Sequence, residues 1–215
     1  GHGAYRASDG GVFYGVEAGS ALIHAAQDSL AQGSTWLLGY SMGARLALSF
    51  AAAFPKRVDG LVLVGGRPGV ARPQERRERV KLDEQWAHLI ESAGVEAFLD
   101  KWQAQSLIGT QERIASHHLE AMQARRRGHV GVGWARSLRA FGTGVMPELW
   151  SQLAAIKCRV ALVVGEEDQK FRAIAEQMNS ALTLSEVVVI PGEVGHAAHL
   201  EEPAGCAREI CRIFD

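Results

Sequence analysis

Three residues of this 215-residue sequence have the types and the order that activate a serine oxygen: Ser41, Asp168 and His196. A serine hydroxyl is a weak nucleophile or base at neutral pH, so it needs a histidine to accept its proton. The histidine in turn needs a carboxylate to hold its tautomer. Each residue follows a predicted buried strand, at the edge where open parallel sheets build their sites. The sequence therefore predicts a serine–histidine–aspartate triad.

The segment around Ser41 is a G-x-S-x-G sequence at residues 39–43. The apolar run 36–38 precedes it and the helix-forming run 44–51 follows, which predicts a strand–turn–helix. We expect both glycines to permit a tight turn that side chains would block. The serine would then lie at a helix start, where free N–H groups favour developing negative charge. We expect Met42 to supply one such N–H to an oxyanion hole.

Other residues compete for two of these roles. Glu166 and Glu167 are alternatives to Asp168, which we prefer because it lies deeper in its turn. His199 is an alternative to His196, although it starts a segment that leads into a proline. The remaining histidines fall in predicted helices, where a packed or solvated ring is the usual interpretation. Taken singly, Asp168 and His196 are also compatible with ordinary turn and loop residues.

Composition is typical of a soluble globular protein, with 47% hydrophobic and 22% charged residues. A net charge of −1 gives no global attraction to nucleic acid or membrane. The three cysteines, Cys158, Cys206 and Cys211, lack metal-ligand spacing, and their odd number argues against a disulfide framework. With neither a signal peptide nor an apolar span, the sequence predicts a cytoplasmic protein without a metal site.

The order of elements predicts an α/β fold with a mostly parallel sheet. We expect buried strands at 35–38, 58–64, 159–164 and 187–190, with intervening helices. A helix at 15–31, which precedes the first strand, is expected to bury an apolar side that includes Leu22, Ile23 and Leu30. Residues 72–153 are helical in pattern, charged and without a clear strand. We therefore predict a core of residues 1–71 and 154–215 with an inserted helical cap at 72–153.

Four segments together are more specific than the serine motif: 39–48, 65–69, 165–171 and 195–203. On these the sequence resembles the 2-succinyl-6-hydroxy-2,4-cyclohexadiene-1-carboxylate (SHCHC) synthases of menaquinone biosynthesis, a family with the α/β-hydrolase fold. The resemblance implies a carbon–oxygen lyase that eliminates pyruvate from a carboxylated cyclohexene, converting SEPHCHC to SHCHC. Ser41 would act as a general base, assisted by His196 and Asp168, without a cofactor or metal.

Such a substrate is a small polycarboxylate, and arginine forks suit carboxylates in a semi-enclosed pocket. Arg45 lies one helical turn after Ser41 and is expected to reach the same cavity. By motif match the resemblance assigns substrate carboxylates to Arg79 and Arg126, and it implies ring packing by Trp102. From their places beside Ser41 and Asp168, Tyr40 is expected to donate a hydrogen bond and Lys170 to anchor a carboxylate. Without the resemblance, the charged run at 72–81 is typical of a solvated helix face. Trp102 would equally be a core residue.

The sequence departs from the resembled family at its start. In that family, strands and an oxyanion loop precede the Gly-His-Gly of residues 1–3. We expect these strands, and the second oxyanion donor, to be missing from this sequence, and a sheet without them would expose a strand edge. We interpret the sequence as a fragment, a reading frame started late or one part of a longer chain.

Two other functions fit the same residues. One is a serine esterase or carbon–carbon bond hydrolase of the α/β-hydrolase superfamily. The other is a catalytically silent, truncated domain. The sequence does not indicate an oligomeric state.

Overall fold

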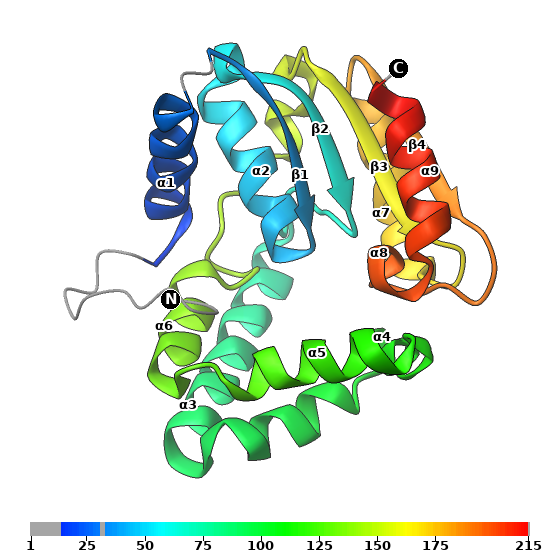
Figure 1. Ribbon diagram of the computed structural model, residues 1–215. Coiled ribbons are helices and arrows are strands. Elements are labelled where there is room, and N and C mark those ends of the chain that lie inside the picture. Colours follow the sequence, from blue (N-terminus) through cyan, green and yellow to red (C-terminus); the bar gives the residue numbers. More distant parts are fainter. Residues whose placement is uncertain (1–13, 31–32, 215) are drawn as a thin grey trace.

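A parallel four-stranded sheet forms the centre of the molecule (Figure 1). The structure is a computed structural model that describes residues 14–30 and 33–214, so residues 1–3 lie outside it. The strands are adjacent in chain order, and they are β1 (Thr35–Tyr40), β2 (Val58–Val64), β3 (Arg159–Gly165) and β4 (Ser185–Ile190). Each predicted strand is present, and the predicted α/β class with a parallel sheet is confirmed.

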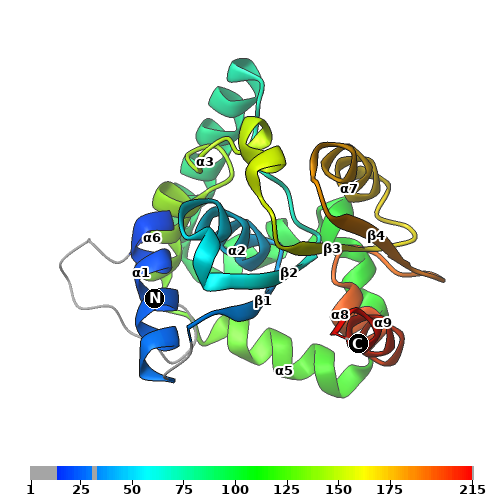
Figure 2. The same cartoon turned by 90° about the horizontal axis from the view of Figure 1, so that it is seen from above.

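Helices cover both faces of this sheet (Figure 2). On one face, Leu61 and Leu63 pack in a core with α2 (Met42–Ala53) and α7 (Gln169–Ala181). On the other face, Val62 and Val64 pack with α9 (Pro203–Phe214). Because successive side chains of a strand point to opposite faces, a strand covered on both sides is apolar throughout. This explains the uninterrupted apolar run of β2.

The helix α1 (Val16–Ser29) packs beside α2, but its buried face differs from the predicted one. Leu22 and Leu30 are 48% and 67% exposed, so they were wrongly assigned to an apolar side. Ile23 does pack against the core. Beside it the buried Gln27 donates hydrogen bonds of 2.8 Å to Thr35 Oγ1 and to a main-chain carbonyl. The buried face of α1 therefore contains a hydrogen-bonded glutamine, whereas the sequence pattern predicted leucines there.

Residues 73–141, between β2 and β3, are largely helical and lie beyond the carboxyl ends of the strands (Figure 1). The α-helices of this segment are α3 (Pro73–Gln103), α4 (Ser106–Gly109), α5 (Ser116–Arg127) and α6 (Gly131–Phe141). The first of them bends at Gly94, whose φ is 86°. Phe98 and Ala135 form part of a separate small core between α3 and α6. Short helices complete the fold at η1 (Pro55–Arg57), η2 (Thr110–Arg113), η3 (Trp150–Ala155) and α8 (Ala198–Glu201).

Candidate active site

Ser41 occupies a sharp turn between β1 and α2. Its φ is 49°, the only positive φ of a non-glycine residue in the part of the chain that the structure describes. A β-carbon on Gly39 would lie 2.4 Å from the carbonyl oxygen of Gly43, so position 39 requires glycine. Position 43 does not, since a β-carbon there would meet nothing within 4 Å. The turn thus depends on one of the two glycines, not on both as the sequence suggested.

The structure brings the three predicted triad residues together. Ser41 Oγ lies 3.1 Å from His196 Nε2, and His196 Nδ1 lies 2.7 Å from Asp168 Oδ2. The other carboxylate oxygen of Asp168 accepts a 3.2 Å hydrogen bond from the amide of Phe171. Asp168 and His196 are 5% and 3% exposed, so their pairing is shielded from water. This geometry lets the histidine accept the serine proton while the carboxylate holds the ring.

The competing residues have other partners. Glu166 accepts a hydrogen bond from the amide of Gly192, and Glu167 forms an ion pair with Arg113. The ring of His199 lies against Tyr40, at a centroid distance of 4.4 Å. Burial lowers the pKa of His199, and the neighbouring His196 lowers it further. None of the three hydrogen-bonds to Ser41 within the described residues, so the geometry favours Asp168 and His196.

A carboxylate that sequence reasoning did not assign holds the loop around His196. Glu201 accepts hydrogen bonds from the amides of Gly195 and Ala197, at 2.6 and 2.9 Å. It also accepts a 3.1 Å hydrogen bond from the hydroxyl of Thr110, which comes from the helical segment. The clue in the sequence was only that Glu201 lies five positions after the histidine.

The predicted oxyanion donor, Met42, is the first residue of α2 and lies at the cavity wall. Amides of the first helical turn have no intrahelical acceptor, so this N–H is available to a ligand. Ser41 N–H, by contrast, donates to the carbonyl of Val64 at 2.8 Å.

Ser41 and His196 open into a cavity of about 550 Å³ between the strand ends and the helical segment. All the predicted substrate-binding residues line it. Its charge is one-sided, because the lining contains five arginine or lysine side chains and no aspartate or glutamate. Those five are Arg45, Arg67, Arg79, Arg126 and Lys170. A concave site of this kind is complementary to a small molecule with several negative charges.

Arg45 joins the helix that follows Ser41 to the end of α6. Its guanidinium donates to the hydroxyl of Thr143, and at 3.3 Å to the carbonyl of Phe141. Burial lowers the pKa of Arg45 to about 10, and the nearby Arg79 contributes in the same direction. Arg79 is paired with the buried carboxylate of Asp83 at 2.7 Å. Both predicted arginines therefore reach the cavity from fixed positions.

Arg126 is held by a different set of residues. Its guanidinium carbon lies 4.8 Å from the centre of the Trp102 ring, an arrangement that favours a cation. One nitrogen donates to Gln111 at 2.7 Å, and Gln111 in turn reaches the hydroxyl of Tyr40 at 3.5 Å. Burial raises the pKa of Tyr40, so its hydroxyl keeps its proton and can donate it in a hydrogen bond. Gln111 had no predicted role, because nothing in its neighbourhood suggests one.

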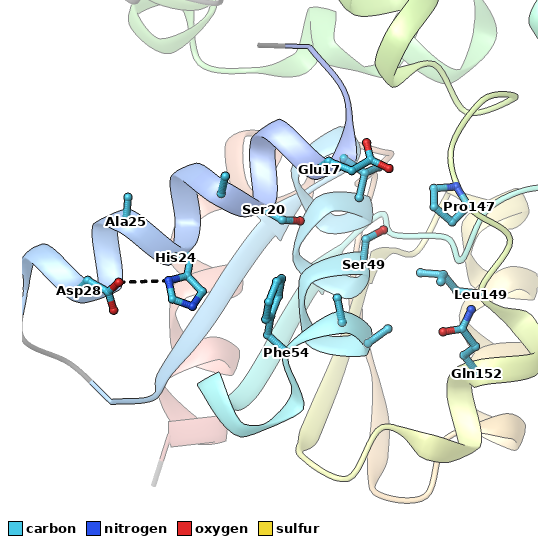
Figure 3. A pocket seen from close by; sticks show the side chains of 14 residues that line it. Glu17, Ser20, His24, Ala25, Asp28, Ser49, Phe54, Pro147, Leu149 and Gln152 are labelled. Carbon is cyan, nitrogen blue, oxygen red and sulfur yellow. Dashed lines mark hydrogen bonds and ion pairs between the residues drawn. The ribbon is translucent and has the colours of Figure 1, made fainter. Parts of the chain in front are cut away.

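A larger cavity, of about 730 Å³, lies between α1, α2 and residues 147–152 (Figure 3). It contains a histidine–carboxylate pair, since His24 Nδ1 lies 3.1 Å from Asp28 Oδ2. Neither serine of its lining, Ser20 or Ser49, hydrogen-bonds to this histidine within the described residues. The hydroxyl of Ser49 donates to the carbonyl of Arg45 in its own helix. This cavity therefore lacks the arrangement seen around Ser41.

Neither a cluster of metal ligands nor a membrane-spanning helix is found in residues 14–30 and 33–214. In these ranges, no three histidine, cysteine or acidic side chains gather as metal ligands would. Nor is any helix there both long enough and apolar enough to span a membrane.

Comparison with known proteins places this site in a family. Residues 12–203 match the α/β hydrolase fold family. A protein of Escherichia coli O1:K1 named 2-succinyl-6-hydroxy-2,4-cyclohexadiene-1-carboxylate synthase is 32% identical over 179 residues, which are 83% of this chain and 68% of that protein. A Bacillus subtilis (strain 168) protein provisionally given the same name is 40% identical over 167 residues.

The aligned part covers 78% of this chain but 61% of the B. subtilis protein, so the chain spans about three-fifths of that relative. Among solved structures, MenH from S. aureus matches with a TM-score of 0.94 and 28% identity, over 100% of this chain and 80% of that one. The α/β-hydrolase fold expected from the sequence is thereby confirmed. The chain belongs to the α/β-hydrolase fold family and, within it, to the 2-succinyl-6-hydroxy-2,4-cyclohexadiene-1-carboxylate synthases.

Proposed function

We propose that this chain carries the site of a lyase that eliminates pyruvate from SEPHCHC, a cyclohexene with succinyl and carboxylate groups, to give SHCHC. The observation that carries the proposal is the cavity beside Ser41, which has five cationic side chains and no acidic one. A serine esterase of neutral substrates gains nothing from desolvating so many cations, whereas a polycarboxylate offsets that cost. The names of the relatives point to the same reaction.

In the proposed mechanism Ser41 is a base. Its hydroxyl proton passes to His196 Nε2, 3.1 Å away, while the serine oxygen takes a proton from a ring carbon. The electron pair of the broken C–H bond forms a new double bond in the ring, the existing ring double bond shifts by one position, and the bond from the ring to the enolpyruvyl oxygen breaks. The leaving group departs as the enolate of pyruvate and takes up a proton. No acyl-enzyme and no water molecule are needed.

The carboxylate of Asp168 stabilises the imidazolium that forms, because it already accepts the hydrogen bond of His196 Nδ1. The free N–H of Met42 would stabilise the developing negative charge. Arg45, Arg79 and Arg126 would hold the carboxylates of the substrate, and Trp102 would pack on its ring. Tyr40 would donate a hydrogen bond from the strand end. These roles agree with the position of each residue on the cavity wall.

We assign two further properties on the same basis. Residues 72–153 would act as the cap of the site, because α3, α5 and α6 contribute much of the cavity wall. The protein would work in the cytoplasm on a small, freely diffusing anion.

The experiment is a pyruvate-release assay on SEPHCHC, coupled to lactate dehydrogenase, with the full-length protein that carries this chain. We expect turnover in the wild type and a loss of about a thousandfold or more in Ser41→Ala, because the base is removed. Ser92→Ala, at an exposed serine of α3, is the matched control and should keep full activity. No pyruvate from the wild type would contradict the lyase.

The same proteins distinguish the alternative functions. A burst of p-nitrophenol from p-nitrophenyl acetate that disappears in Ser41→Ala, without any pyruvate release, would identify an esterase. A full-length protein inactive in both assays would be the catalytically silent domain.

A further inference from the structure

Arg67 is a cation of the cavity wall to which no role has been assigned so far. It belongs to the loop of residues 65–69, which follows β2, and its side chain is half-buried. Burial lowers its pKa, and the proximity of Arg79 lowers it further. A charged group kept in such surroundings is costly unless something compensates it. Arg67 is therefore expected to face a group of opposite charge.

The loop that carries Arg67 is fixed on both sides. The amide of Gly65 donates to the carbonyl of Val163 at 2.9 Å, and the carbonyl of Pro68 accepts from Leu149 at 2.8 Å. At Gly69, with a φ of 88°, a β-carbon would lie 2.5 Å from the carbonyl of Pro147. A loop packed this closely holds the base of the Arg67 side chain in one place.

The guanidinium itself is only partly satisfied. Arg67 Nε donates to the carbonyl of Gly69 at 3.1 Å, which orients the plane of the group. Its two terminal nitrogens make no hydrogen bond, and Arg67 makes no ion pair, with any of the residues that the structure describes. Those two nitrogens are the pair that binds the two oxygens of one carboxylate.

Lys170 has the same lack of partners. It lies in the first turn of α7, just after β3, which is the neighbour of β2 in the sheet. Its ammonium group makes no hydrogen bond or ion pair within the described ranges. Lys170 and Arg67 line the same cavity from the ends of two adjacent strands. Burial lowers the pKa of Lys170, and Arg67 is the next largest cause.

The other cations of the cavity already have protein partners. Arg79 is paired with Asp83, Arg45 donates to Thr143, and Arg126 is bound to Gln111. The carboxylates that act on Arg67 and Lys170 are Asp168, which is paired with His196, and Glu75, which hydrogen-bonds to Arg72 at 3.3 Å. Within the described residues, Lys170 and the two terminal nitrogens of Arg67 therefore lack a hydrogen-bond or ion-pair partner from the protein.

We propose that Arg67 and Lys170 form a carboxylate-binding subsite of the cavity, and that Arg67 selects for a second anionic group on the substrate. This deepens the proposed function, on which it rests, by naming the residues that recognise a second carboxylate. A ligand without that carboxylate would leave both cations desolvated and unpaired, and would be rejected for that reason.

The test measures the binding of 2-succinylbenzoate, a ring with one carboxylate on the ring and one on a succinyl chain. Binding is followed by the fluorescence of Trp86, Trp102 and Trp134, which line the cavity. We expect Arg67→Gln to weaken binding by about tenfold or more, and Lys170→Gln by a similar factor. Arg72→Gln, at an exposed arginine next to the cavity helix, is the matched control and should bind as the wild type does.

The variant Arg67→Lys distinguishes a structural role of Arg67 from a role in binding an anion. This variant keeps the positive charge but loses the guanidinium Nε that donates to Gly69. If Arg67 binds an anion, lysine should restore part of the affinity through its charge, although it cannot reproduce the two-nitrogen contact of the guanidinium. Equal losses in the glutamine and lysine variants, or no loss in Arg67→Gln, would overturn the subsite. So would a wild-type protein that does not bind 2-succinylbenzoate.

Failure of the proposed function gives a different result. A protein that binds 2-succinylbenzoate in an Arg67-dependent way but releases no pyruvate from SEPHCHC would contradict the lyase and support the subsite. In an active enzyme, Arg67→Gln should raise KM about tenfold and change kcat less than about threefold.

Discussion

Gly65 lies directly against the imidazole of His196. A β-carbon at position 65 would stand 2.6 Å from Cε1 of the ring and 2.9 Å from Nδ1. The backbone of Gly65 also has a positive φ of 58°, which side chains disfavour. The absence of a side chain at position 65 therefore lets the His196 ring lie where its Nε2 is 3.1 Å from Ser41 Oγ.

Replacing Gly65 with alanine should misplace His196. We expect Gly65→Ala to lower kcat by about a hundredfold, because a displacement of about 1 Å at a catalytic group has that effect. The positive φ should cost about 1–2 kcal/mol of stability in addition. Pyruvate release and thermal unfolding measure the two effects. Gly109→Ala, at a helical glycine with free space around it, should change neither by much. Full activity of Gly65→Ala would show that the ring can be accommodated elsewhere.

Asp168→Asn tests the carboxylate that holds the histidine. The NH2 group of asparagine can donate to Nδ1, which favours the tautomer with the proton on Nε2, so that the ring can no longer accept the serine proton. We expect kcat to fall by about a thousandfold or more, with little change in KM. Glu167→Gln is the control, since that carboxylate is paired with Arg113 at the surface. A greater loss in Glu167→Gln than in Asp168→Asn would reassign the acid.

The pH dependence of KM should report the ionisation of Lys170. Burial, Arg67 and Arg79 lower the pKa of Lys170, and Asp168 and Glu75 oppose them. Because lysine is charged below its pKa, this one loses its charge at a lower pH than the usual value of about 10.4. KM for the anionic substrate should therefore rise with pH before an ordinary lysine titrates.

Two variants check this assignment. Lys170→Arg keeps its charge throughout and should abolish the rise of KM. Arg67→Gln removes a neighbouring positive charge, which should raise the pKa of Lys170 and move the rise to higher pH. A profile that is the same in Lys170→Arg and the wild type would exclude Lys170 as its source.

Trp102 should contribute to binding through Arg126. The guanidinium lies 4.8 Å from the ring centre, and such contacts contribute about 0.5–2 kcal/mol. We expect Trp102→Leu to raise KM by about 3- to 30-fold and Trp102→Phe, which keeps an aromatic face, to raise it less. Kinetics at constant salt measure the change. A fall in kcat at unchanged KM would indicate instead that Trp102 shapes the geometry around Ser41.

The sheet and the position of the triad were predictable because both depend on local signals. The apolar run of β2 predicts a strand covered on both faces, and the residue after each such strand lies at one edge of the sheet. The chain order of Ser41, Asp168 and His196 then completes the prediction. The ends of the predicted strands differ from the observed ones by only a few residues.

The residues that were missed depend on partners far away in the sequence. Gln111, which was missed, holds Arg126 at a separation of 15 positions, and Glu201 meets Thr110 over 91 positions. No local pattern contains such pairs. The buried face of α1 was missed for a related reason, since the hydrogen bonds of Gln27 to Thr35 and η1 outweigh the leucine pattern.

The hydrogen bond from Thr110 to Glu201 has a consequence for protein engineering. Glu201 positions the loop of the base, and one of its three donors comes from the helical segment between β2 and β3. A β-carbon on Gly195 would in turn collide with Thr110, so loop and segment are fitted to each other. Exchanging that segment for one from a relative with another substrate preference would thus disturb the catalytic machinery unless the graft kept a hydroxyl at position 110. The loop around His196 and the helical segment should therefore be exchanged as one unit.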